Sequence, residues 1–139
     1  MSAGSGITHS EYNLETEVTQ IFQIWILPDE QGGAPQWGTR PFPKGDRAGR
    51  FVTLASGFEG DDALPVRAQA RVSGATLRAG ESTTYRLGRD RKAYLVPAFG
   101  RIEIEGETVD ARDGAAIADV DEVRVRALED SEVVLVDVK

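Results

Sequence analysis

The chain of 139 residues has no cysteine, one histidine and one methionine. Without cysteine it can form neither disulfides nor thiolate metal sites, which fits a cytoplasmic protein. No apolar run approaches the roughly 20 residues needed to span a bilayer, and no basic segment followed by an apolar core marks a signal peptide. One histidine near a terminus cannot build a Ser-His-Asp triad, and no Walker-type phosphate loop is present. We therefore expect a cytoplasmic protein that does not contact a membrane.

The net charge is −7, with 23 acidic and 16 basic residues. A uniformly negative field repels phosphate, so we expect no direct nucleic-acid binding. One local basic cluster surrounds Gly88 and consists of Arg86, Arg89, Arg91 and Lys92. We interpret it as a solvated hairpin loop; the alternative is a contact with a phosphate or an acidic partner.

The chain carries 15 glycines and 6 prolines, and these punctuate short apolar runs. No stretch keeps a 3.6-residue period over three turns, so helices are not expected. Regular short strands separated by turn residues indicate an all-β sandwich or barrel. We predict strands near residues 51–56, 66–72, 74–78, 82–87, 93–98, 101–105, 115–118, 122–127 and 132–138.

The sequence divides into three parts. Residues 1–28 combine a histidine motif with an apolar run, residues 29–49 are polar and irregular, and residues 50–139 hold the predicted strands. About 90 residues are enough for a small β-barrel core. We therefore predict one β-domain, preceded by an N-terminal β arm and a connection.

The apolar run at residues 18–27 predicts a strand with two apolar faces. Such a strand needs cover on both sides. The cover can come from a second copy, which would give a homo-oligomer through residues 18–27, or from residues 50–139 of the same chain. Trp25 and Trp37 are expected to be packing residues.

Near the start of the chain, Gly4, Gly6, His9 and Asn13 have the spacing of the second half of a cupin metal motif, with Gly4 where a proline is usual. His9 and Glu11 are two residues apart, so on a strand they share a face and can bind one metal. The alternative is an exposed pair near a frayed terminus. A mononuclear site needs about four protein ligands, so the chain carries half of a site.

The later part of the chain keeps the glycines of the cupin pattern but not its ligands. Starting from Gly80 and from Gly106, the metal-ligand positions fall on residues that do not bind a cation: Arg86, Gly88, Ala93 and Ile117. We therefore predict a cupin-like (double-stranded β-helix, or jelly-roll) barrel at 50–139 without a metal. Three aromatic residues near these positions either line a small-molecule pocket or belong to the core, which we favour: Tyr85, Tyr94 and Phe99.

The whole chain resembles the C-terminal part of the pirin family. Four segments carry the likeness: Met1-Ser-Ala-Gly-Ser-Gly-Ile-Thr-His9-Ser-Glu11, Phe22-Gln-Ile-Trp25-Ile, Gly74-Ala-Thr-Leu-Arg-Ala-Gly80-Glu and Ala127-Leu-Glu-Asp-Ser-Glu-Val-Val-Leu-Val-Asp137. Pirins are bicupins, and their N-terminal barrel binds one metal, usually iron. The resemblance implies that His9 and Glu11 are metal ligands in the complete protein, joined there by an upstream His-x-His pair.

The resemblance also implies a missing partner, the N-terminal cupin barrel. Met1 is then internal to a longer protein, a misassigned start or the product of a truncation. The implied cofactor is Fe(II) or another divalent first-row metal in the full-length protein, with none expected in this chain. The complete protein would be a quercetin 2,3-dioxygenase-like or redox-sensing protein, with residues 50–139 as structural support. The alternatives are a non-catalytic protein-binding module and a homodimer whose metal site uses two His9/Glu11 pairs.

Overall fold

The computed structural model describes residues 1–139, in which an irregular N-terminal arm precedes a β-domain. One short 3-10 helix, η1 (Lys44–Arg47), lies between them. The strands are β1 (Val52–Ser56), β2 (Leu64–Pro65), β3 (Ala70–Leu77), β4 (Ser82–Arg86), β5 (Lys92–Phe99), β6 (Ile102–Ile104), β7 (Glu107–Val109), β8 (Ala115–Ala118), β9 (Glu122–Ala127) and β10 (Ser131–Val138).

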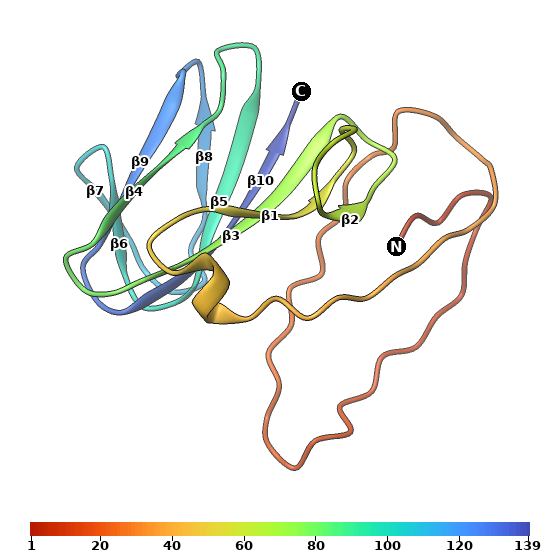
Figure 1. Cartoon of the computed structure of the whole chain (residues 1–139), viewed down its shortest axis with the longest axis horizontal. Helices are drawn as coiled ribbons and strands as arrows, with labels where there is room; N and C mark the ends of the chain where they lie inside the picture. Colours follow the sequence, from red (N-terminus) through yellow and green to blue (C-terminus); the bar gives the residue numbers. More distant parts are fainter.

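The strands form two sheets that face each other (Figure 1). The six-stranded sheet has the order β2-β1-β3-β10-β5-β8, and the four-stranded sheet has the order β4-β9-β6-β7. Fourteen buried side chains from both sheets make one core, which includes Leu77, Leu95, Val125 and Leu135. The prediction of an all-β fold is confirmed.

Alternating side chains explain why the strands near the C-terminus form where the sequence predicts. In β9, Val123 and Val125 are buried, whereas Arg124 and Arg126 are exposed on the opposite face. A strand places successive side chains on opposite faces, so this alternation puts one face on the core and the other in solvent. The predicted bounds of β8 and β9 agree with the structure.

The strands predicted at 66–72 and 74–78 are in fact one strand, β3. Ser73, which the prediction left between them, and Gly74, which began the second, both lie inside β3 and pair with β1 and β10. A Cβ atom at Gly74 would lie 3.2 Å from Nη1 of Arg47, so glycine leaves room for η1 to pack on the sheet. Strands β2 and β7 were not predicted.

The prediction of a strand at residues 18–27 is wrong for this structure, because the segment has no regular secondary structure. A strand needs a neighbour that accepts its backbone hydrogen bonds, and this segment has none. It does not fold against residues 50–139 either, since only Ile26 is half-buried. Trp25 and Trp37 are 87% and 74% exposed, so neither is a packing residue here.

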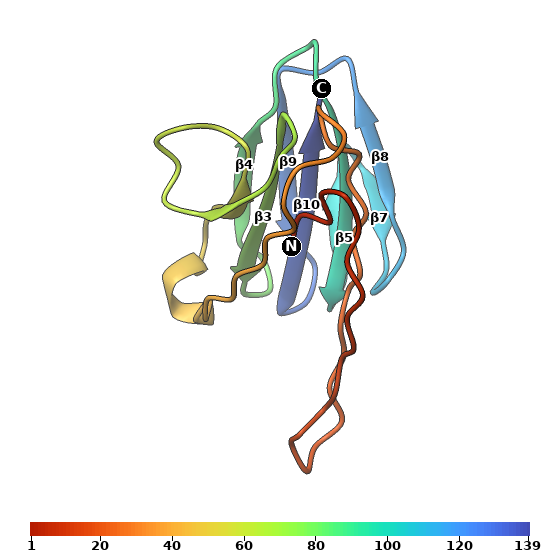
Figure 2. The same cartoon turned by 90° about the vertical axis from the view of Figure 1, so that its right-hand side faces the viewer.

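The arm lies on the side of the six-stranded sheet that faces away from the four-stranded sheet (Figure 1). Figure 2 shows that its tip extends beyond the ends of the strands. Behind the arm, the outer face of the six-stranded sheet carries half-buried Val72, Val134 and Val136 and the exposed Tyr94. No helix of the structure has the length and apolar character to cross a membrane.

Candidate functional site

His9 and Glu11 lie in the arm, where the side chains approach each other. The His9 Nε2 and Glu11 Oε1 atoms are 3.6 Å apart, and the two side chains are 37% and 56% exposed. Each donor sits about 2.1 Å from a bound first-row metal, so atoms at this separation can share one cation. No group of three or more His, Cys, Asp or Glu side chains in the chain is arranged to hold a metal. The donor set therefore fits half of a metal site.

The interior positions of β4 differ from those predicted by glycine spacing. Arg86, which the spacing placed at a ligand position, is exposed, whereas its neighbours Tyr85 and Leu87 are buried. The spacing was therefore one residue out of register on this strand. Ala93 and Ile117 do pair with each other and face the core.

A buried polar cluster, made of Asp137, Tyr85 and Arg91, occupies one end of the interior. Asp137 is 1% exposed. Its Oδ2 accepts a hydrogen bond of 2.8 Å from the Tyr85 hydroxyl, and its Oδ1 accepts one of 2.5 Å from Arg91 Nε. Burial raises the pKa of the Tyr85 hydroxyl, and the hydrogen bond to Asp137 raises it further. The cluster thus holds a neutral phenol and a paired carboxylate away from water.

A second ion pair lies at the same end of the β-domain and joins Asp61, in the loop between β1 and β2, to Arg71 of β3. Asp61 Oδ2 accepts hydrogen bonds from Arg71 Nε at 2.8 Å and from Ser56 Oγ at 2.5 Å. Both donors favour the carboxylate form and lower the pKa of Asp61, with Arg71 as the larger cause. The hydrogen bond to Asp61 in turn raises the pKa of Arg71, whose guanidinium also lies 4.2 Å from the centre of the Phe58 ring.

The Asp61 pair predicts a defined acid sensitivity. Because the pKa of the Asp61 carboxyl is lower in the folded protein than its ordinary value of 3.8, the pair stabilises the fold fully above about pH 5 and less as the pH falls. Asp61→Asn is expected to cost about 1.5–3 kcal/mol at pH 7 and to flatten the decrease in unfolding free energy between about pH 5 and 2. Urea titrations at several pH values measure both effects.

Asp62→Asn is the matched control for this prediction. Asp62 is the next residue, and its exposed carboxylate pairs with Arg40 at 2.7 Å. Exposed ion pairs contribute about 0–1 kcal/mol to stability. The unfolding free energy of this variant is therefore expected to depend on pH as that of the parent protein does. Equal acid profiles for Asp61→Asn and Asp62→Asn would contradict the role given to the Asp61–Arg71 pair.

The predictions for the basic loop and for the three aromatic residues are each confirmed in part, since Arg86, Arg89 and Lys92 are exposed and Tyr85 belongs to the core. Arg91 is not solvated, because it turns inward to Asp137, while Arg89 pairs on the surface with Asp121. Tyr94 and Phe99 are 51% and 64% exposed and do not belong to the core. Tyr94 faces outward because it alternates with the buried Ala93 and Leu95. Phe99 lies two residues after the inward-facing Pro97, and it faces outward because the pairing with β10 shifts register there, where Pro97 pairs with Val133 but Phe99 pairs with Glu132.

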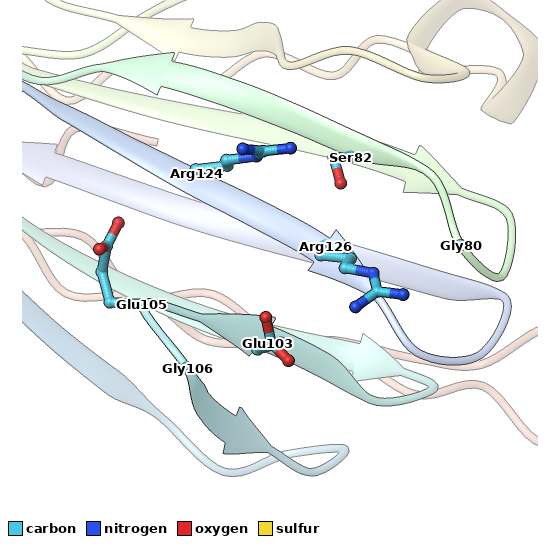
Figure 3. A pocket seen from close by; sticks show the side chains of 7 residues that line it. All are labelled: Gly80, Ser82, Glu103, Glu105, Gly106, Arg124 and Arg126. Atoms are coloured by element: carbon cyan, nitrogen blue, oxygen red, sulfur yellow. The ribbon is translucent and has the colours of Figure 1, made fainter.

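A polar hollow with a volume of about 470 Å³ lies on the outer face of the four-stranded sheet. Figure 3 shows the residues that line it. It is lined by two arginines, two glutamates, one serine and two glycines: Arg124, Arg126, Glu103, Glu105, Ser82, Gly80 and Gly106. Small-molecule sites are mostly apolar with a few placed polar groups, and this hollow has no apolar side chain. Its charges are mixed, so we assign it no ligand.

Sequence reasoning missed Asp137 and Asp61, although one signal for Asp137 was available. Asp137 lies on the same face of β10 as Val133 and Leu135, so an acidic residue stands in an apolar row. A charge at such a position requires a buried partner. The partner, Arg91, lies on another element, and no local pattern identifies it.

Comparisons with known proteins place this geometry in a family. Residues 53–138 match the model of the quercetinase C-terminal cupin domain. A pirin-like protein of Caulobacter vibrioides is 66% identical over 138 residues, which are 99% of this chain and 60% of that protein. A quercetin 2,3-dioxygenase of Escherichia coli is 33% identical over 138 residues, with 99% and 58% covered. The chain therefore spans about 60% of the length of these relatives.

A solved structure agrees with the fold. The crystal structure of the bacterial pirin YhhW from Escherichia coli in complex with nickel(II) superposes with a TM-score of 0.74 and 26% sequence identity. The superposition covers 82% of this chain and 48% of that one, so the matching part is again about half of a longer protein. The cupin-like fold predicted from the sequence is confirmed, and this chain belongs to the pirin family, whose quercetinase C-terminal cupin domain it contains.

Proposed function

We propose that this chain is the C-terminal part of a two-barrel pirin-like protein and that it supports a metal-bearing N-terminal barrel. The observation that carries the proposal is the arm: residues 18–27 are apolar, exposed and unpaired, and His9 and Glu11 lie just before them. An exposed apolar segment of this size marks an interaction surface. An upstream barrel that pairs with the arm would cover it.

In that complete protein, His9 and Glu11 would supply two ligands to a divalent first-row metal, for which Fe(II) is our first choice. An imidazole and a carboxylate suit such metals, and the remaining protein ligands would come from the upstream barrel. The bound metal would supply the dioxygen or redox chemistry. The role of this chain would be to hold the His9 and Glu11 donors close together and to support the arm that carries them.

The β-domain would pack against the metal barrel and close one side of its pocket. Its outer face carries a continuous apolar row, because Val136 of β10 pairs with Val72 of β3 on one side and with Tyr94 of β5 on the other. This face lies on the same side as the arm (Figure 2). A partner that covers the arm would therefore reach the apolar row as well.

The test compares metal content and mass in solution for this chain and for a complete two-barrel version, after loading with Fe(II) or Mn(II). We expect about one metal per complete protein, lost in His9→Ala, and none retained by this chain. The proposal is wrong if the complete protein binds one equivalent of metal equally well with and without His9.

A non-catalytic protein-binding module is the second candidate, and it is favoured by Tyr94 and Phe99, which are large, aromatic and exposed on β5. Flavonol turnover by the iron-loaded complete protein would favour the dioxygenase; stoichiometric iron without turnover would favour the regulatory module. A dimer of this chain that retains half an equivalent of metal per chain would instead favour a site shared between two His9/Glu11 pairs.

A further inference from the structure

We propose that Arg67 is a positioning residue that holds the segment carrying His9 and Glu11 against the β-domain. This inference rests on the proposed function, in which His9 and Glu11 are metal ligands of the complete protein. Arg67 lies between β2 and β3, far from His9 in the sequence. It is the only side chain of the β-domain that donates hydrogen bonds to residues 1–36.

The first layer of the contact joins Arg67 to the returning half of the arm. Arg67 Nη2 donates to the Ala34 carbonyl at 2.9 Å, and Nη1 donates to the Gly32 carbonyl at 3.5 Å. The Arg67 backbone carbonyl accepts from the Asp29 amide at 3.0 Å. The planar fork of a guanidinium suits two carbonyls at once, which a lysine ammonium cannot reproduce.

The second layer joins that returning half to the start of the chain. The Ser2 amide donates to the Gln36 carbonyl at 2.7 Å, and the Gln36 amide donates back to the Ser2 carbonyl at 2.9 Å. The Ser5 amide donates to the Gly33 carbonyl at 2.9 Å. His9 follows only four residues after Ser5, so its place depends on this pairing.

Two glycines let Arg67, residues 32–34 and residues 2–5 approach one another closely. A Cβ atom at Gly33 would lie 2.8 Å from Arg67 Nη1, and one at Gly4 would lie 2.5 Å from the Gly33 carbonyl oxygen. Gly33 and Gly4 also have positive φ angles of 80° and 57°. Glycine tolerates both the close contacts and the left-handed backbone. The sequence thus builds a stack in which Arg67 supports residues 32–34 and these support residues 2–5.

The first experiment uses the chain as it is and measures amide hydrogen exchange by NMR. Arg67→Ala is expected to remove protection at Ser5 and Gln36 and to leave protection at Leu135 in β10 unchanged. Arg67→Lys should retain part of the protection at Ser5 and Gln36. Arg78→Ala, which removes an exposed arginine with no side-chain contact to the arm, should change nothing. Unchanged protection at Ser5 and Gln36 in Arg67→Ala would overturn the inference.

The second experiment measures the effect on metal binding in the complete protein with cobalt(II) chloride as the probe. Loss of a group that hydrogen-bonds a metal ligand directly costs about tenfold to a hundredfold in metal affinity. Arg67 acts through the backbone of residues 32–34, so for Arg67→Ala we expect a loss of about tenfold and an altered visible spectrum. Arg78→Ala should match the parent protein in both.

His9→Ala separates failure of this inference from failure of the proposed function. If His9→Ala retains cobalt with the parent affinity, the proposed ligand role is wrong. If His9→Ala loses cobalt while Arg67→Ala keeps the parent affinity and spectrum, the ligand role stands and the positioning role of Arg67 is wrong.

Discussion

Asp137→Leu is expected to lower the free energy of unfolding of the β-domain by about 3 kcal/mol. The substitution removes the acceptor of two buried donors, the Tyr85 hydroxyl and Arg91 Nε. Removing one partner of a buried ion pair lowers the free energy of unfolding by about 3–5 kcal/mol, because the other charge stays buried without compensation. We expect the lower end of this range, since the Arg91 side chain is 14% exposed and can turn toward solvent.

The double variant Asp137→Leu, Arg91→Met provides the control for this prediction. Replacing a whole buried ion pair by apolar residues is often neutral or stabilising. The double variant should therefore recover the part of the loss that comes from the unpaired guanidinium, whereas the buried Tyr85 hydroxyl stays without its acceptor and keeps a loss of about 1–2 kcal/mol. Urea unfolding of both variants and of Arg91→Met completes the cycle. If the two single losses simply add, the carboxylate and the guanidinium do not interact as the structure indicates.

Trp25→Ala is expected to have a small effect on the stability of this chain and a large one on the stability of the complete two-barrel protein. In this chain Trp25 is 87% exposed, so the substitution should change stability by less than about 0.5 kcal/mol. In the complete two-barrel protein the arm would be covered, and truncation of a buried tryptophan costs about 3–5 kcal/mol. Urea unfolding of the four proteins, followed by circular dichroism, measures both values.

The comparison of the same substitution in two lengths of chain is its own control, because intrinsic effects of the tryptophan cancel. Fluorescence adds an independent readout, because the chain has two tryptophans and Trp25→Ala removes only one of them. The emission lost in Trp25→Ala should lie at shorter wavelength in the complete protein than in this chain. A small stability change in both settings would show that the arm stays exposed, and the covering barrel would then lose its main support.

Local alternation made the β-domain predictable from the sequence. In β9 the buried Val123 and Val125 alternate with arginines, and a period of two is readable without knowledge of the partner strand. The glycine spacing was less informative on β4, where it selected Arg86 in place of the buried Tyr85. Glycines mark the positions of turns. One extra residue in a turn moves every side chain of the following strand to the other face of the sheet.

Long-range pairs were not predictable. Arg91 sits in a run of basic residues and reads as solvated, yet it turns inward because Asp137, on a strand far along the chain, offers a buried carboxylate. The strand predicted at residues 18–27 does not form, because the partner that it needs is missing. Its apolar pattern is that of a strand, but a strand forms only beside another, and this chain contains no neighbour for it.

The stacked contact at the base of the arm has a consequence for synthesis. The start of the chain is held by residues 33–36, and these are held by Arg67, which the ribosome adds much later. Domains generally form in order from the N-terminus during synthesis. Here the first residues cannot reach their final place until the loop between β2 and β3 has emerged. Any barrel that precedes this chain and uses the arm would complete its folding only after the β-domain has begun its own.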